Sequence, residues 1–136
     1  MVMGENIKIL LIEDNHGDAY LIEEHFEEFA NFSYELKIVE TLDEALRVLK
    51  KKHFDVILLD LELPDSYGIN TFLSVHNKNP LIPIIILTGL SDRTIESYAI
   101  KKGVYDFLVK GQTEDRLLEG IIRCSLERKK RLSAII

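Results

Sequence analysis

The sequence has little of what marks secreted, disulfide-linked or membrane-spanning proteins. Its one cysteine, Cys124, cannot form an internal disulfide and alone cannot build a cysteine metal site, so we expect this thiol to serve helix packing. The longest nearly uninterrupted apolar stretch, residues 81–87, is far shorter than the roughly 20 residues that a membrane helix needs, and the N-terminus carries no basic and apolar signal pattern. We therefore expect a cytoplasmic protein with no membrane partner.

An excess of positive charge is also missing. The chain has 17 lysines and arginines against 23 aspartates and glutamates, and its formal net charge is -6. An acidic surface repels phosphates, which argues against direct binding to nucleic acid. The sequence also contains no DNA-binding helix-turn-helix pattern. The basic run at residues 128–131 is interpreted as a solvated helix end, because cations complement the helix dipole there.

What is present is the pattern of an α/β domain. The 136 residues suit one core, so we expect residues 1–136 to form a single domain. Runs rich in β-branched residues alternate with amphipathic stretches, as in βαβ units around a parallel sheet. Right-handed crossovers then favour a flavodoxin-like, doubly wound sheet with strand order 2-1-3-4-5. The five runs are residues 7–12, 34–39, 56–59, 84–87 and 105–109. The second run alternates polar and apolar residues, which predicts an edge strand.

Capping residues indicate where helices begin and end. Asp92 and Thr113 are placed to start the fourth and fifth helices, and Gly103 to end the fourth. The fifth helix is expected within residues 113–136. Its apolar pattern continues further toward the C-terminus than a free-standing domain needs. That pattern contains Leu118, Ile122, Leu132 and Ile135. Either this tail packs on the domain, or it is a signalling helix that dimerises or leads into a further domain; both interpretations stay open.

Acidic residues follow two of the predicted strands. Glu13 and Asp14 end the first strand and Asp60 ends the third, so the topology brings three carboxylates to one edge of the sheet. Two like charges ~4 Å apart repel by roughly 4 kcal/mol at an effective dielectric near 20, and a divalent cation offsets that repulsion. Hard oxygen ligands suit Mg2+, with Asp14 and Asp60 binding directly and Glu13 acting through water. The nearby His16 is interpreted as a surface residue.

A hydroxyl and an ammonium are expected at the same edge. Thr88 ends the fourth strand and Lys110 ends the fifth. Phosphoryl transfer requires positioned reactants and neutralised charge on the equatorial oxygens, which Mg2+, Thr88 and Lys110 supply together. Asp60 is then placed to be the nucleophile that forms an aspartyl phosphate.

The segments KILLIEDN, DVILLDLELPDSYG, IIILTG and YDFLVK together resemble the receiver domains of two-component response regulators. The resemblance covers essentially the whole chain. It implies that Asp60 is the phosphorylated aspartate, that Thr88 is the switch hydroxyl, and that Lys110 is the lysine that assists phosphotransfer. It also implies that the backbone carbonyl of Glu62 completes the Mg2+ ligands, with its side chain at the mouth of the site, and that Phe107 is the aromatic switch residue. We expect the Phe107 ring to become buried when Asp60 is phosphorylated.

By the same resemblance, the chain accepts a phosphoryl group from a histidine kinase or a phosphotransfer protein. It is then a signalling switch, not a metabolic enzyme, and acts on a downstream effector protein or a fused output domain, with a homodimer as a further option. The expected output face is the fourth helix, fifth strand and fifth helix. It would include residues 91–102 and the region from Tyr105 through Arg116 to Cys124.

One position departs from the family pattern. Gly111 follows Lys110, where a proline that supports a cis peptide is usual. Glycine supplies unusual backbone angles of its own, so the geometry of this loop is not predicted.

Rival functions fit only parts of the pattern. A phosphatase of the haloacid dehalogenase type carries its DxD motif after the first strand, whereas Asp60 follows the third strand and precedes Glu62 by two positions. A flavodoxin-like cofactor binder needs a hydroxyl- and glycine-rich loop after the first strand, where this chain has EDNHGD. A degenerate receiver that only binds partners is disfavoured because all the key chemical groups are present.

Overall fold

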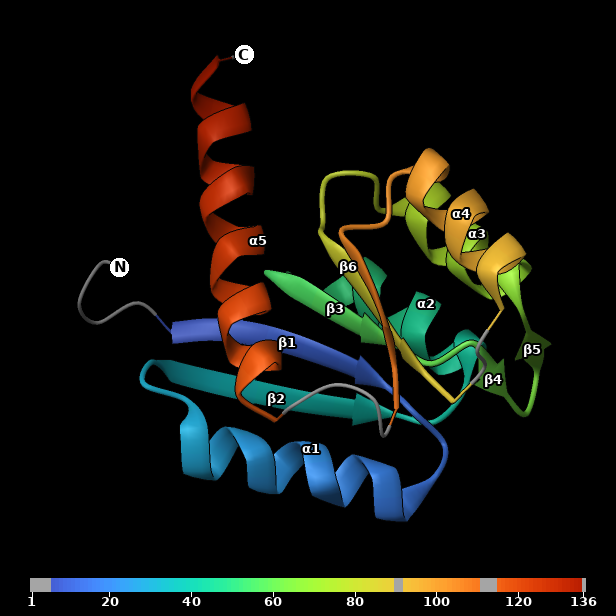
Figure 1. The fold of residues 1–136 in the computed structure, drawn as a ribbon, viewed down its shortest axis with the longest axis horizontal. Coiled ribbons are helices and arrows are strands. Elements are labelled where there is room, and N and C mark those ends of the chain that lie inside the picture. Colours follow the sequence, from blue (N-terminus) through green and yellow to red (C-terminus); the bar gives the residue numbers. More distant parts are fainter. Residues whose placement is uncertain (1–5, 90–91, 111–114, 136) are drawn as a thin grey trace.

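A parallel sheet forms the centre of the computed structural model, which describes residues 6–89, 92–110 and 115–135. The strand order is β2-β1-β3-β6-β7 (Figure 1). Because β6 and β7 are the fourth and fifth strands of this sheet, the predicted order 2-1-3-4-5 is confirmed, and β2 is an edge strand as predicted. The strand bounds are β1 (Asn6–Ile12), β2 (Ser33–Val39), β3 (Val56–Leu59), β6 (Ile84–Thr88) and β7 (Asp106–Val109).

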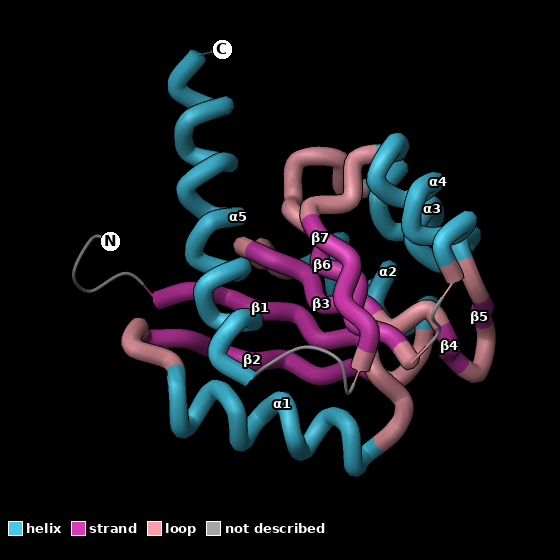
Figure 2. Tube along the Cα trace, viewed as in Figure 1, coloured by secondary structure: helices cyan, strands magenta, loops and turns pink. Residues whose placement is uncertain are grey.

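Helices cover both faces of the sheet. One face packs against α1 (His16–Phe29) and α5 (Asp115–Ile135). The other packs against α2 (Leu42–Lys51), α3 (Ile69–Lys78) and α4 (Arg93–Lys102) (Figure 2). Within the described ranges, no helix is long and apolar enough to cross a membrane.

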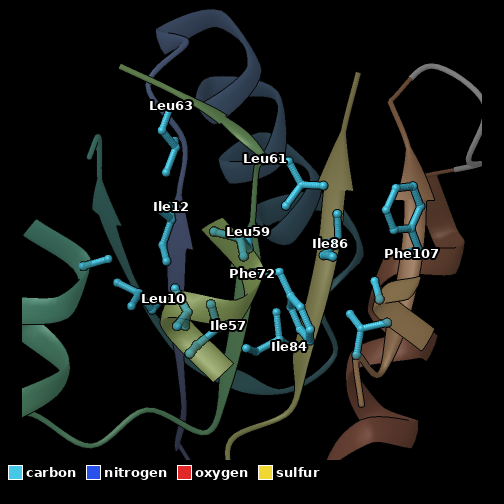
Figure 3. Close-up of a cluster of buried hydrophobic side chains, with 14 of the residues drawn as sticks. Leu10, Ile12, Ile57, Leu59, Leu61, Leu63, Phe72, Ile84, Ile86 and Phe107 are labelled. Atoms are coloured by element: carbon cyan, nitrogen blue, oxygen red, sulfur yellow. The ribbon is translucent and has the colours of Figure 1, made fainter. Parts of the chain in front are cut away.

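Side chains of the central strands alternate between two buried layers. In β3, Ile57 and Leu59 belong to the layer beneath α2, α3 and α4, whereas Val56 and Leu58 belong to the layer beneath α1 and α5. All four are fully buried, as expected of a strand covered on both faces. Figure 3 shows the first of these layers, in which Phe72 of α3 lies against the sheet. The rigid strands therefore hold their carboxyl ends at one edge.

Two of the predicted helix ends are confirmed. The Asp92 side chain caps α4 by accepting hydrogen bonds from the backbone N–H groups of Thr94 (2.8 Å) and Ile95 (3.3 Å). Gly103 ends the same helix with a φ of 106°, in the left-handed region that favours glycine. Thr113 and Gly111 lie outside the described residues, so the start of α5 and the loop without proline stay predictions.

A short hairpin follows Asp60. It pairs β4 (Glu62–Leu63) with β5 (Ser66–Tyr67). The Asp65 carboxylate, at its tip, accepts hydrogen bonds from the backbone N–H groups of Leu42 (2.9 Å) and Asp43 (3.0 Å) at the start of α2. Desolvation raises the pKa of Asp65, but these backbone hydrogen bonds outweigh it and the net pKa is lowered. The hairpin is thereby tied to α2 beside the carboxylate edge.

Helix α5 corrects one expectation. Cys124 is exposed and does not serve helix packing, because the buried side of α5 is formed by Leu118, Ile122 and Ser125. The C-terminal half of α5 extends beyond the sheet (Figure 1). The side chains of Leu132 and Ile135 lie outside the described ones, so the two interpretations of the tail remain open.

Candidate functional site

The three predicted carboxylates meet at the carboxyl edge of the sheet. Glu13, Asp14 and Asp60 each offer an oxygen, and these oxygens all lie within 4.8 Å of one another. Backbone hydrogen bonds continue the sheet into this cluster, from Glu13 N to Val39 O (2.9 Å) and from Asp60 N to Ile12 O (3.0 Å). Glu13 and Asp60 are buried, whereas Asp14 is half-buried. The site is thus a largely buried cluster of negative charge that is anchored to the sheet.

Lys110 supplies the positive charge of this site. Its ammonium donates hydrogen bonds to Asp18 Oδ2 (2.8 Å), to Asp60 Oδ2 (3.0 Å) and to the Glu13 carboxylate. A backbone hydrogen bond from Lys110 N to Thr88 O (2.8 Å) holds it beside the end of β6. Burial lowers the pKa of Lys110, but the hydrogen bonds to the carboxylates outweigh that effect and the net pKa is raised. The ammonium therefore stays protonated in this site.

The pKa of Glu13 is raised by its burial and by a neighbouring carboxylate. Burial is the largest cause that raises the pKa of Glu13, the neighbouring Asp60 raises it further and Lys110 lowers it, with a net pKa of about 7. A bound cation favours the ionised form of crowded carboxylates, so this cluster favours cation binding. Its potential metal ligands are hard carboxylate oxygens, which Mg2+ prefers. These residues fit Mg2+.

Thr88 and the Glu62 backbone hold the other oxygen of Asp60. The Thr88 hydroxyl is fully buried and donates a hydrogen bond to Asp60 Oδ1 at 3.0 Å. The backbone N–H of Glu62 donates to the same oxygen at 3.1 Å. Both oxygens of Asp60 are therefore oriented by donors, Oδ2 by Lys110 and Oδ1 by Thr88 and Glu62. Preorganised donors of this kind stabilise charge that develops on a transferring group.

The Glu62 side chain is exposed, and its carboxylate lies near Gly89, directly after the end of β6. The role of its backbone carbonyl as a metal ligand stays a prediction. His16 is exposed and its Nε2 lies 3.1 Å from Glu40 Oε1, so it pairs at the surface.

Phe107 requires a correction. We expected its ring to become buried as a result of phosphorylation, but it is already only 7% exposed in this structure. It packs in the same layer as Ile86, its partner on the neighbouring strand (Figure 3). New burial of this ring cannot therefore provide the free energy of a switch starting from this arrangement. The end of β6, from Ile86 to Thr88, nevertheless connects the ring with Asp60.

Asp18 is the site residue that the sequence analysis missed. It lies in the first turn of α1, and its carboxylate contacts Lys110 across the chain. Its place shortly after the acidic pair was the available signal. That signal is weak, because acidic residues are common in the first turn of helices, where they complement the dipole.

The sequence has counterparts among known proteins. The family model described as the response regulator receiver domain matches residues 9–122. The regulatory protein LuxO of Vibrio cholerae is 33% identical over 109 residues, which cover 79% of this chain and 23% of LuxO. The transcriptional regulatory protein ZraR of Salmonella typhimurium is 29% identical over 119 residues, covering 88% of this chain and 26% of ZraR.

A solved structure extends the likeness to the fold. The response regulator receiver domain protein from Clostridium thermocellum superposes with a TM-score of 0.80 at 26% identity, over 93% of this chain and 98% of that one. By contrast, the chain spans about a quarter of the length of the curated relatives it matches.

Proposed function

This chain belongs to the response regulator receiver domain family, and we propose that Asp60 is its phosphate acceptor, supplied by a histidine kinase or a phosphotransfer protein. The observation that carries the proposal is the double support of the Asp60 carboxylate, by Lys110 at one oxygen and Thr88 at the other. A carboxylate that only capped a turn would need neither a half-buried ammonium nor a buried hydroxyl.

The reaction assigns a role to each residue. An Asp60 oxygen attacks phosphorus, and the bond from phosphorus to the donor nitrogen breaks as the new acyl phosphate bond forms. Lys110 and Thr88 then donate to phosphoryl oxygens. Asp14 and Asp60 would hold Mg2+ directly, Glu13 through water, and the Glu62 carbonyl would complete the protein ligands. Mg2+ would neutralise charge on the transferring group.

The output follows from the neighbours of Thr88. On β7, Val109 is its register partner and Phe107 lies two positions earlier, beside Ile86. Movement of the Thr88 hydroxyl toward a phosphoryl oxygen would change packing along β7, an edge strand with α4 over one face and α5 over the other. We propose that the surface formed by α4, β7 and α5 is the one that an effector, a fused output domain or a second copy contacts. Ser91 and the Arg116 side chain, also expected there, lie outside what the structure describes.

Phosphorylation should require Mg2+. A phosphoryl group adds about -1.5 to -2 charges, which the carboxylate cluster cannot accommodate unaided. Incubation with acetyl phosphate and Mg2+ should add one phosphoryl group per chain, as measured by intact mass, and excess chelator should abolish the labelling. Equal labelling with and without the chelator would contradict the proposed role of the metal. Sustained turnover of a generic phosphomonoester would instead favour the phosphatase alternative.

Thr88→Ala should uncouple the site from the output face. Beryllofluoride, a mimic of the phosphoryl group, should still bind with Mg2+, because Asp60 and Lys110 remain. In wild type its amide NMR shifts should spread over α4, β7 and α5, whereas in Thr88→Ala they should stay in the loops around Asp14 and Asp60. Thr88→Ser keeps the hydroxyl and should restore the spread. An undiminished spread in Thr88→Ala would rule out coupling through this residue.

A further inference from the structure

The three N–H donors of the Lys110 ammonium are all engaged by carboxylates. They reach Glu13, Asp18 and Asp60, and an ammonium has no fourth donor. A phosphoryl oxygen arriving at Asp60 can therefore bind Lys110 only if one of these hydrogen bonds is released. The hydrogen bond of Lys110 that breaks most easily therefore influences how strongly the site binds the phosphoryl group.

The surroundings of the three carboxylates distinguish them. The Glu13 side chain is 3% exposed and that of Asp60 is 6% exposed, but that of Asp18 is 39% exposed. A carboxylate released inside the protein would lose its partner without gaining water, which is unfavourable. Asp18 is rehydrated when released, so its hydrogen bond is the easiest of the three to break.

The backbone of Asp18 is held independently of its carboxylate. The side chain of Asn15, which caps α1, accepts a hydrogen bond from Asp18 N at 2.9 Å. The turn that carries Asp18 is thereby anchored whether or not the carboxylate contacts Lys110. The carboxylate is then available to hold the ammonium or to turn toward solvent.

We propose that Asp18 is a positioning residue. Its carboxylate holds the Lys110 ammonium in the unmodified chain and releases it to the phosphoryl oxygens. This inference rests on the proposed function. Asp18 thus opposes the phosphorylated state in two ways, because it competes for the ammonium and adds a negative charge beside an incoming anion. In the metal-bound state without phosphate it acts in the opposite sense, because it draws the ammonium away from the carboxylates that hold the cation.

Asp18→Asn should therefore change two affinities in opposite directions. At saturating Mg2+, beryllofluoride should bind about fivefold more tightly than to wild type, while Mg2+ alone should bind about twofold more weakly. Both dissociation constants can be measured by amide NMR titration. Asp18→Glu retains the charge and should return both values toward those of wild type. A purely structural defect would weaken both interactions together.

Glu40→Gln is the matched control. Glu40 is an exposed carboxylate that follows β2 at the same edge of the sheet and pairs with His16. It should leave both affinities unchanged. The inference is overturned if Asp18→Asn matches wild type, if it weakens both ligands, or if Glu40→Gln has the same effect. Failure of wild type to bind beryllofluoride, or equal binding by Asp60→Asn, would instead overturn the proposed function and this inference with it.

Discussion

Asp60→Asn is expected to abolish phosphoryl labelling while the chain stays folded. The amide keeps the size of the carboxylate and an oxygen that accepts the hydrogen bonds from Thr88 and Glu62, but it lacks the anionic oxygen that attacks phosphorus. One negative charge also leaves a crowded cluster, so the unfolding midpoint should not fall below that of wild type. Intact mass after incubation with acetyl phosphate and Mg2+ measures the first effect, and thermal unfolding monitored by circular dichroism the second.

Asp43→Asn is a suitable control for this variant. Asp43 is exposed on α2, where it pairs with Arg47, and its loss should leave labelling at the wild-type level. If Asp60→Asn is labelled at the wild-type rate in the presence of Mg2+, another residue is the acceptor. The assignment of Asp60 would then be wrong even though the family assignment would stand.

Lys110→Ala is expected to slow phosphorylation on the order of a hundredfold, the effect typical of removing one preorganised donor from a developing charge. The variant takes the ammonium from the buried carboxylates of Glu13 and Asp60. Mg2+ should nevertheless bind at least as tightly as to wild type, because a competing positive charge is gone. The time course of intact mass and a Mg2+ titration give the two measurements.

Two other lysines provide the comparison. Lys101 and Lys102 are exposed in the last turn of α4, away from the carboxylate edge. Alanine at either position should leave the phosphorylation rate unchanged. Equal losses at all three lysines would exclude a specific role for Lys110. Weaker Mg2+ binding in Lys110→Ala would indicate that the carboxylate cluster itself had rearranged.

The sequence by itself determined the order of the elements and the edge at which the chemistry lies. Runs such as residues 56–59 are apolar throughout because both faces of the strand are covered. The crossover rule then arranges the strands, and their carboxyl ends bring Asp14, Asp60, Thr88 and Lys110 together. These inferences need only local periodicity and handedness, which neighbouring residues encode.

Tertiary structure alone decided several individual side-chain contacts and burials. Asp18 contacts Lys110 across 92 positions of sequence, and Asp65 caps a helix that begins 23 positions before it. Neither pairing has a local pattern. No local pattern predicts the burial of Phe107 or the exposure of Cys124 either. The rotation of a helix and the depth of a ring depend on how elements pack against one another, because side-chain contacts between distant segments exist only once those segments are docked.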